Sequence, residues 1–136
     1  MRVLIVDDDK NVVDLLTSFV VACNHEVVDT VTGGGLEAMR SFTRHDPDLV
    51  LLDIIMPKFN GFTVCNQLVS RNPKIKVVLM SGLVDQSYPS VASCGAVEYL
   101  RKPLHFARFR ELMEKIALSM ESSPVALDAG SAPATT

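Results

Sequence analysis

Two kinds of hydrophobic pattern alternate along this chain, and that alternation constrains the fold more than any other feature. Short apolar runs rich in β-branched residues are separated by stretches in which apolar residues recur every three or four positions. Strands that alternate with helices in this way predict βα units, a parallel sheet and helices on both of its faces. A sheet covered on both sides also explains why the strands are apolar almost throughout. The predicted strands are residues 3–6, 27–28, 49–52, 75–80 and 96–100.

Between the predicted strands, apolar residues follow the spacing of amphipathic helices. The last stripe is the clearest, because its large apolar residues recur at intervals of three and four. Segment 86–94 is the least certain helix, since Pro89 interrupts it and its apolar content is low. The four stripes are Val12, Leu15, Leu16, Phe19, Val20 and Cys23; Leu36, Met39 and Phe42; Phe62, Cys65, Leu68 and Val69; and Phe106, Phe109, Met113 and Ile116.

The length of 136 residues allows one domain of ordinary size, which we expect at residues 1–118. Residues 119–136 are expected to form a disordered tail, because the segment is rich in Ser, Ala, Pro and Thr and has no apolar period. The glycines at 33–35 predict a flexible turn, since they lack the GxGxxG spacing of a dinucleotide-binding loop.

Composition argues against several classes of protein. A net charge of -3, with no cluster of Lys and Arg, gives no sign of direct nucleic-acid binding. No apolar run is long enough for a membrane span or for the core of a signal peptide. Cys23, Cys65 and Cys94 lie far apart without a CxxC spacing, which favours reduced packing thiols. We therefore expect a cytoplasmic protein with no membrane partner.

The carboxyl ends of the predicted strands carry the residues with chemical potential. In an open parallel α/β sheet, binding sites form beyond these ends. A helix cap after the first strand would need only one of the three aspartates at 7–9. Asp53 interrupts the apolar run LVLLDIIMP, where a carboxylate is costly unless it is paired or bound to a cation. The strand ends lead into Asp7, Asp8 and Asp9, into Asp53, into Ser81 and Gly82, and into Lys102 and Pro103.

Convergence of the acidic groups predicts a metal site. If Asp7, Asp8 and Asp53 meet at one edge, their like charges raise one another's pKa and destabilise the fold. A bound divalent cation removes that conflict, and a ligand set of oxygens without His or Cys favours Mg²⁺ or Mn²⁺ over zinc. Two or three carboxylates do not fill an octahedron, so water or a phosphoryl oxygen must complete it.

The segments VLIVDDD, LVLLDIIMP followed by NGF, VVLMSG and EYLRKP resemble, in order and spacing, the receiver (phosphoacceptor) domain of two-component response regulators. The resemblance covers about residues 1–118 and implies a flavodoxin-like fold, doubly wound, with a five-stranded sheet of strand order 2-1-3-4-5. It implies that Asp53 accepts a phosphoryl group from a sensor histidine kinase or a histidine phosphotransfer protein. The signal would then pass by conformational change to a protein partner or to a missing output domain.

The resemblance also implies roles for neighbouring residues. By motif position, Asp8 binds Mg²⁺ directly with Asp53, Asp7 binds it mainly through water, and Ile55 offers its backbone carbonyl. Such a chain is not a classical enzyme, because it catalyses only its own phosphorylation and dephosphorylation.

Three further positions belong to the implied switch. Lys102 and the Ser81 hydroxyl would take the remaining phosphoryl oxygens, and Lys102–Pro103 is a candidate cis peptide. Tyr99 matches the family's switch aromatic, which turns inward when Ser81 moves toward the phosphoryl group; a strand tyrosine with its hydroxyl at the surface is the alternative. The downstream partner is then expected at the last two helices and the fifth strand, residues 86–94, 96–100 and 104–118.

Two apolar residues occupy positions that flank the path of the hydrolytic water in this family. Ile55 lies two residues past Asp53, and Leu83 lies two past Ser81. Apolar side chains cannot orient that water, so we expect a long-lived phosphorylated state; partner contact or simple packing is the alternative.

Two rival functions remain open at this stage. LIVDDDKN also fits the hhhDxDx pattern of a haloacid-dehalogenase-like phosphatase, with Asp7 as nucleophile and Asp9 as general acid. That reading leaves Asp53 without a role and finds no acidic pair at a strand end after Lys102. The other rival is a receiver that never takes phosphate and serves as a docking module.

Overall fold

The computed structural model describes residues 1–56, 59–82 and 93–121. They divide into two compact units, Met1–Leu104 and a second unit that begins at His105. In the described residues, the first unit holds a five-stranded sheet, a two-stranded sheet and three helices, and the second unit holds one helix.

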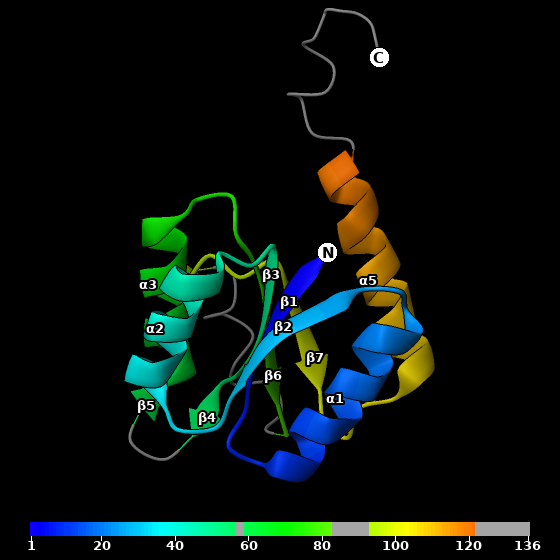
Figure 1. Cartoon of the computed structure of the whole chain (residues 1–136), viewed down its shortest axis with the longest axis horizontal. Coiled ribbons are helices and arrows are strands. Elements are labelled where there is room, and N and C mark those ends of the chain that lie inside the picture. Colours follow the sequence, from blue (N-terminus) through cyan, green and yellow to red (C-terminus); the bar gives the residue numbers. More distant parts are fainter. Residues whose placement is uncertain (57–58, 83–92, 122–136) are drawn as a thin grey trace, which may run out of the picture. The chain divides into compact units, whose positions relative to one another are not determined.

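The main sheet has the predicted parallel architecture (Figure 1). The strands lie in the order β2-β1-β3-β6-β7, and every neighbouring pair is parallel. Numbered within this sheet alone, that is the expected order 2-1-3-4-5, so the predicted fold is confirmed. Its strands are β1 (Arg2–Val6), β2 (Glu26–Val31), β3 (Leu49–Asp53), β6 (Lys76–Ser81) and β7 (Glu98–Arg101).

A short antiparallel pair of strands lies between β3 and α3 in the chain and is not part of the main sheet. Strands β4 (Ile55–Met56) and β5 (Phe59–Asn60) pair with each other after β3. The sequence did not predict this pair, because a strand of two residues is too short to display a period.

Helices cover both faces of the sheet in the first unit. α2 (Gly35–His45) and α3 (Gly61–Arg71) lie side by side on one face, and α1 (Lys10–Ala22) lies on the other (Figure 1). Most of segment 86–94, the least certain predicted helix, falls outside the described residues. Strand side chains alternate between the two layers, so that Leu4 and Val6 join the core under α2 and α3 while Val3 and Ile5 are buried on the opposite face.

Two of the predicted helices begin at side-chain caps. The Asp9 carboxylate accepts a hydrogen bond from the Asn11 amide at 2.9 Å, and the Asn60 side chain accepts one from the Phe62 amide at 2.7 Å. The stripe predicted for α2 is wrong at Leu36, which is 67% exposed, because the buried face of that helix runs through Ala38, Ser41 and Phe42.

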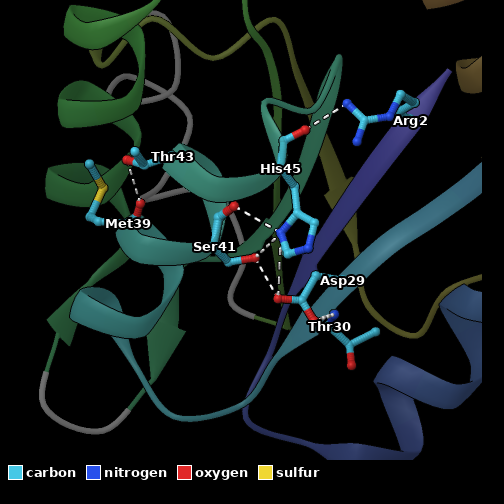
Figure 2. A network of polar contacts seen from close by, with 7 residues as sticks. All are labelled: Arg2, Asp29, Thr30, Met39, Ser41, Thr43 and His45. Atoms are coloured by element: carbon cyan, nitrogen blue, oxygen red, sulfur yellow. Dashed lines mark hydrogen bonds and ion pairs between the residues drawn. The ribbon is translucent and has the colours of Figure 1, made fainter.

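A polar network ties α2 to β2 and β1 (Figure 2). The Ser41 hydroxyl donates to Asp29 Oδ2 at 2.6 Å, and His45 Nδ1 lies 3.1 Å from the Ser41 carbonyl oxygen and 3.9 Å from Asp29 Oδ2. Arg2 Nη1 donates to the carbonyl oxygens of His45 and Asp46 at 2.6 and 2.9 Å, where the helix ends. The guanidinium thereby satisfies carbonyl groups that the helix leaves unpaired.

The second unit is described as helix α5 (Phe106–Glu121). Four large apolar side chains along one side of it are buried: Phe109, Leu112, Met113 and Ile116. The helix continues to Glu121, past the expected boundary at 118, because Met120 and Glu121 are good helix formers and each further turn adds hydrogen bonds at little cost. No helix in the described part of the chain combines the length and the apolar character that crossing a bilayer requires.

Candidate phosphoacceptor and metal site

The polar residues singled out at the strand ends converge at one edge of the main sheet. Asp7 follows β1, Asp53 ends β3, Ser81 ends β6 and Lys102 follows β7. Backbone hydrogen bonds hold these ends together, because the Ile54 amide donates to the Met80 carbonyl and the Lys102 amide donates to the Ser81 carbonyl, both at 2.9 Å. Parallel pairing therefore brings side chains from distant parts of the chain to one edge.

Three carboxylates form the centre of this group. Asp7, Asp8 and Asp53 each offer an oxygen, and these oxygens all lie within 4.8 Å of one another. Asp7 and Asp53 are buried, at 0% and 4% exposure, whereas Asp8 is exposed. Three negative charges at such distances repel one another strongly where water is excluded.

Lys102 supplies the positive charge. Its Nζ lies 2.8 Å from Asp7 Oδ2 and 3.6 Å from Asp53 Oδ2. Burial alone would lower the pKa of Lys102, but the hydrogen bond to Asp7 and the charge of Asp53 outweigh it, so the pKa of Lys102 is raised. The ammonium is therefore held in its charged form. The Lys102–Pro103 peptide bond is cis, the conformation anticipated for it.

Asp9 supports the buried Asp7. The Asp9 amide donates to Asp7 Oδ1 at 2.9 Å, while the Asp9 carboxylate caps α1 through Asn11. Asp7 thus has a protein donor on each oxygen, one from Asp9 and one from Lys102. Sequence reasoning missed this supporting role. The available signal was the residue type, because an aspartate side chain often accepts a hydrogen bond from the backbone amide two residues later in a turn.

Asp53 is less well compensated than Asp7. Among the described residues, its Oδ1 accepts one long hydrogen bond, 3.4 Å, from the Ile55 amide. Desolvation by burial, followed by the charge of Asp7, raises the pKa of Asp53 to about 6, although Lys102 opposes the rise. A carboxylate with a raised pKa at a partly closed edge is typical of a reactive group.

The donor set suits a hard divalent cation. Among the residues that the structure describes, two buried carboxylates and one exposed carboxylate face one another with the ammonium of Lys102 beside them, which leaves an excess of negative charge there. All the donors are oxygens, as Mg²⁺ and Mn²⁺ prefer, and the number of carboxylates leaves positions for water or for a phosphoryl oxygen.

Gly61 fixes the backbone beneath Asp53. A Cβ at this position would lie 2.6 Å from the Ile54 Cα and 2.7 Å from the Asp53 carbonyl oxygen, and the Gly61 amide donates to the Ile54 carbonyl at 2.8 Å. Only glycine permits this close approach. The motif NGF was noted in the sequence, but its backbone role requires the coordinates.

A model of the response regulator receiver domain matches residues 3–116 of this chain. The chain belongs to that family. A receiver domain is a signalling switch activated by phosphorylation, and not a classical enzyme.

Relatives of two lengths are similar to this receiver domain. It is 32% identical over 118 residues to the chemotaxis protein CheY of Listeria monocytogenes, covering 86% of this chain and 98% of that protein. It is 30% identical over 115 residues to the probable C4-dicarboxylate response regulator DctR of Bacillus subtilis, covering 84% of this chain. The chain spans about half the length of DctR, 51%.

Solved structures resemble this receiver domain closely. A two-component response regulator from Clostridium difficile has a TM-score of 0.81 at 25% identity, with 90% of this chain and 99% of that chain covered. A chain of the CheX–CheY–BeF₃–Mg complex of Borrelia burgdorferi has a TM-score of 0.80 at 29% identity, with 85% of this chain and 88% of that chain covered. Both support the flavodoxin-like fold found here.

The remaining predicted residues of the receiver domain lie in different environments. Ser81 is buried at the end of β6, and Tyr99 is 6% exposed within the core that underlies α2 and α3. The Ile55 side chain, in contrast, is 55% exposed beside Asp53. Leu83 lies outside the described residues.

Proposed function

We propose that this receiver domain accepts a phosphoryl group on Asp53 from the phosphohistidine of a sensor histidine kinase or a histidine phosphotransfer protein. The observation that supports this most strongly is the grouping of Asp53 with two further carboxylates and Lys102 at one edge of the sheet. Within this group, Asp53 is the buried carboxylate that has the weakest hydrogen bonding and the raised pKa.

Transfer makes Asp53 a nucleophile. A carboxylate oxygen attacks the phosphorus atom, the bond from phosphorus to the donor imidazole nitrogen breaks, and the imidazole leaves with a proton from solvent. With a pKa of about 6, Asp53 is largely ionised at neutral pH and available for attack. Little covalent work remains for the protein, so positioning and charge neutralisation carry the catalysis.

Each neighbouring residue then has a distinct task. Asp8, Asp53 and the Ile55 carbonyl would hold Mg²⁺ or Mn²⁺, with Asp7 acting mainly through water; the bound ion supplies positive charge to the incoming phosphoryl group. The Lys102 ammonium changes its ion-pair partner from the carboxylates to a phosphoryl oxygen, and the Ser81 hydroxyl donates a hydrogen bond to another phosphoryl oxygen. The new negative charge is thereby met by groups that already line the edge.

A mass measurement with a small phosphodonor tests the proposal. We expect acetyl phosphate with Mg²⁺ to add one phosphoryl group to the native chain, and a chelator to prevent it. Asp53→Asn should remain unmodified while keeping its fold, and Asp9→Asn serves as the matched control because that carboxylate caps α1. Equal modification of native chain and Asp53→Asn would refute the assignment.

A second assay, release of phosphate from a phosphomonoester, distinguishes the phosphatase alternative. In a haloacid-dehalogenase-like enzyme, Asp7→Asn abolishes release of phosphate from a phosphomonoester and Asp53→Asn does not. Two contacts argue against it, because Asp9 is engaged as a helix cap and Asp7 is bonded to Lys102. A docking module that never takes phosphate would gain no mass under any of these conditions.

For output, we propose that Ser81 moves toward the phosphoryl group and that Tyr99 turns inward into the space that Ser81 leaves. A downstream protein, in the cytoplasm, would read the change at segments 96–100 and 104–118 and at segment 86–94. Tyr99→Ala should weaken the phosphorylation-dependent capture of that protein without reducing the mass gain on Asp53. An equal loss of both would contradict a role in output.

We also propose that the phosphorylated state is long-lived. Ile55 exposes an apolar side chain beside Asp53, and such a side chain cannot orient a hydrolytic water. Ile55→Asn and Leu83→Glu should each accelerate decay of the phosphorylated chain. The decay is measured as the loss of the added mass over time. Equal or slower decay in both variants would refute this proposal.

A further inference from the structure

Two thiols lie together in the core of the first unit, away from the acidic edge. The Cys65 thiol, on α3, donates to the carbonyl oxygen of Cys94 at 3.4 Å, and both residues belong to the same buried cluster. Cys65 is 0% exposed and Cys94 is 7% exposed. The two residues come from segments separated by 29 positions, so their meeting depends on the fold and not on local sequence.

The turn that carries Cys94 is seated directly on α3. The next residue, Gly95, has φ +94, and a Cβ there would lie 3.0 Å from a methyl group of Val69. Val69 follows Cys65 by one helical turn, so consecutive residues of the turn contact consecutive positions on one face of α3. The backbone at Cys94 is therefore fixed close to the Cys65 side chain, and a disulfide forms only between residues that are neighbours in the fold.

We propose that Cys65 and Cys94 are an oxidation site, at which a low-molecular-weight disulfide such as glutathione disulfide forms a reversible bond between the two sulfurs. Cys94 attacks first, forming a mixed disulfide and releasing one glutathione. Cys65 then attacks the Cys94 sulfur and releases the second glutathione. Both protein thiol protons pass, through solvent, to the released glutathione thiolates, so two protein thiols are oxidised as one external disulfide is reduced.

The environments of the two thiols support this order. Burial, together with the adjacent Cys94, raises the pKa of the Cys65 thiol, which makes it the poorer first nucleophile. Cys94 has the small exposed fraction through which the oxidant enters. The bond would join α3 to the turn that leads into β7 and Tyr99. Disulfides inside reducing compartments are typically transient and redox-sensing, which is the role that we assign to this one.

Intact-mass analysis of the full chain tests the proposal, in a Cys23→Ser background that removes the third thiol. We expect incubation of the folded chain with glutathione disulfide to remove the mass of two hydrogen atoms, to block alkylation of both cysteines, and to be reversed by dithiothreitol. In the same background, Cys65→Ser should instead retain a glutathione adduct on Cys94, because no second thiol can release it.

Peptide mapping of the native chain must place the disulfide between Cys65 and Cys94. Circular dichroism recorded during oxidation checks that the chain stays folded, so that disulfide formation cannot be ascribed to unfolding. Unreacted thiols, stable adducts on the two-cysteine chain, a bond between molecules, or a disulfide formed only in denaturant would each overturn the proposal. None of these readouts depends on phosphorylation of Asp53.

Discussion

Lys102 makes its shorter ion pair with Asp7, at 2.8 Å, and its longer one with Asp53, at 3.6 Å. The ammonium thus compensates Asp7, the more deeply buried carboxylate, and leaves Asp53 only partly neutralised. This inequality helps to explain why the proposed phosphoacceptor has a raised pKa, since a cation at greater distance lowers the pKa of a carboxylate less.

Removing the Lys102 ammonium should destabilise the metal-free chain. In Lys102→Met, Asp7 and Asp53 face each other without the Lys102 ammonium, and loss of one partner from a buried ion pair costs roughly 3–5 kcal/mol of unfolding free energy. Urea denaturation in EDTA measures this loss. Mg²⁺ should restore more stability to the variant than to the native chain, because it replaces the missing positive charge.

Lys10→Met is the matched control for that substitution. Lys10 pairs with Asp14 at 3.8 Å on the exposed side of α1, and such a pair contributes at most about 0.5 kcal/mol. Similar losses of unfolding free energy in the two lysine variants would contradict a larger contribution from the buried ion pair at the edge of the sheet.

Stability of the metal-free chain should fall as pH rises from about 4 to about 7. The pKa of Asp53 is raised from 3.8 to about 6 in the folded state, so the folded chain binds this proton more tightly than the unfolded chain. That contribution is fully present below the unfolded pKa and is lost as pH rises through the folded pKa. It amounts to roughly 3 kcal/mol, since a tenfold difference in proton affinity corresponds to about 1.4 kcal/mol.

Asp53→Asn isolates this effect. The amide does not titrate, so the variant should gain stability relative to the native chain over the same pH interval, as measured by urea denaturation in EDTA. A difference between the two proteins that stays constant with pH would contradict the raised pKa of Asp53.

A methyl group at Gly61 should disturb the backbone that carries Asp53. In Gly61→Ala the new Cβ would meet the backbone of Asp53 and Ile54, which cannot yield as a flexible side chain would. We expect a loss of roughly 1–3 kcal/mol in unfolding free energy and slower gain of phosphoryl mass from acetyl phosphate. Gly82→Ala is the steric control, because a Cβ there would meet no atom of the described residues within 4 Å. Equal losses of stability in both variants would refute the close-approach argument.

Ser41→Ala should loosen the connection between α2 and β2. The substitution removes the 2.6 Å hydrogen bond to Asp29 from a buried position, for which about 1–3 kcal/mol is expected. Thermal or urea unfolding measures the loss. Thr43→Ala, on the exposed side of the same helix, should cost well under about 1 kcal/mol, and a larger loss there would contradict the importance of the buried network.

The sheet could be predicted because short apolar runs rich in β-branched residues indicate strands, and strands that alternate with helices form a parallel sheet. Each predicted apolar run lies in or overlaps a strand, and two of the strands end at residues that the sequence had singled out, Asp53 and Ser81. The grouping of the three aspartates followed from parallel topology alone.

Other features could not be predicted, because they depend on distances between backbone segments. No periodicity reveals that the Cβ of a residue at position 61 would strike the backbone of Ile54, or that Lys102 lies nearer to Asp7 than to Asp53. The exposure of Leu36 was likewise hidden, since a stripe of three apolar residues fits more than one face of a short helix.

The backbone hydrogen bonds that join Ile54 to Met80 and Lys102 to Ser81 have a mechanical consequence. They lock the tips of three strands into a rigid frame, so that the arrival of a phosphoryl group cannot be accommodated by spreading the strands apart. Inside that frame the proposed response would be torsional: the rotation of the Ser81 hydroxymethyl group and the swing of the Lys102 side chain. A large signal would then start from a few bond rotations, with the sheet itself acting as the fixed support against which they work.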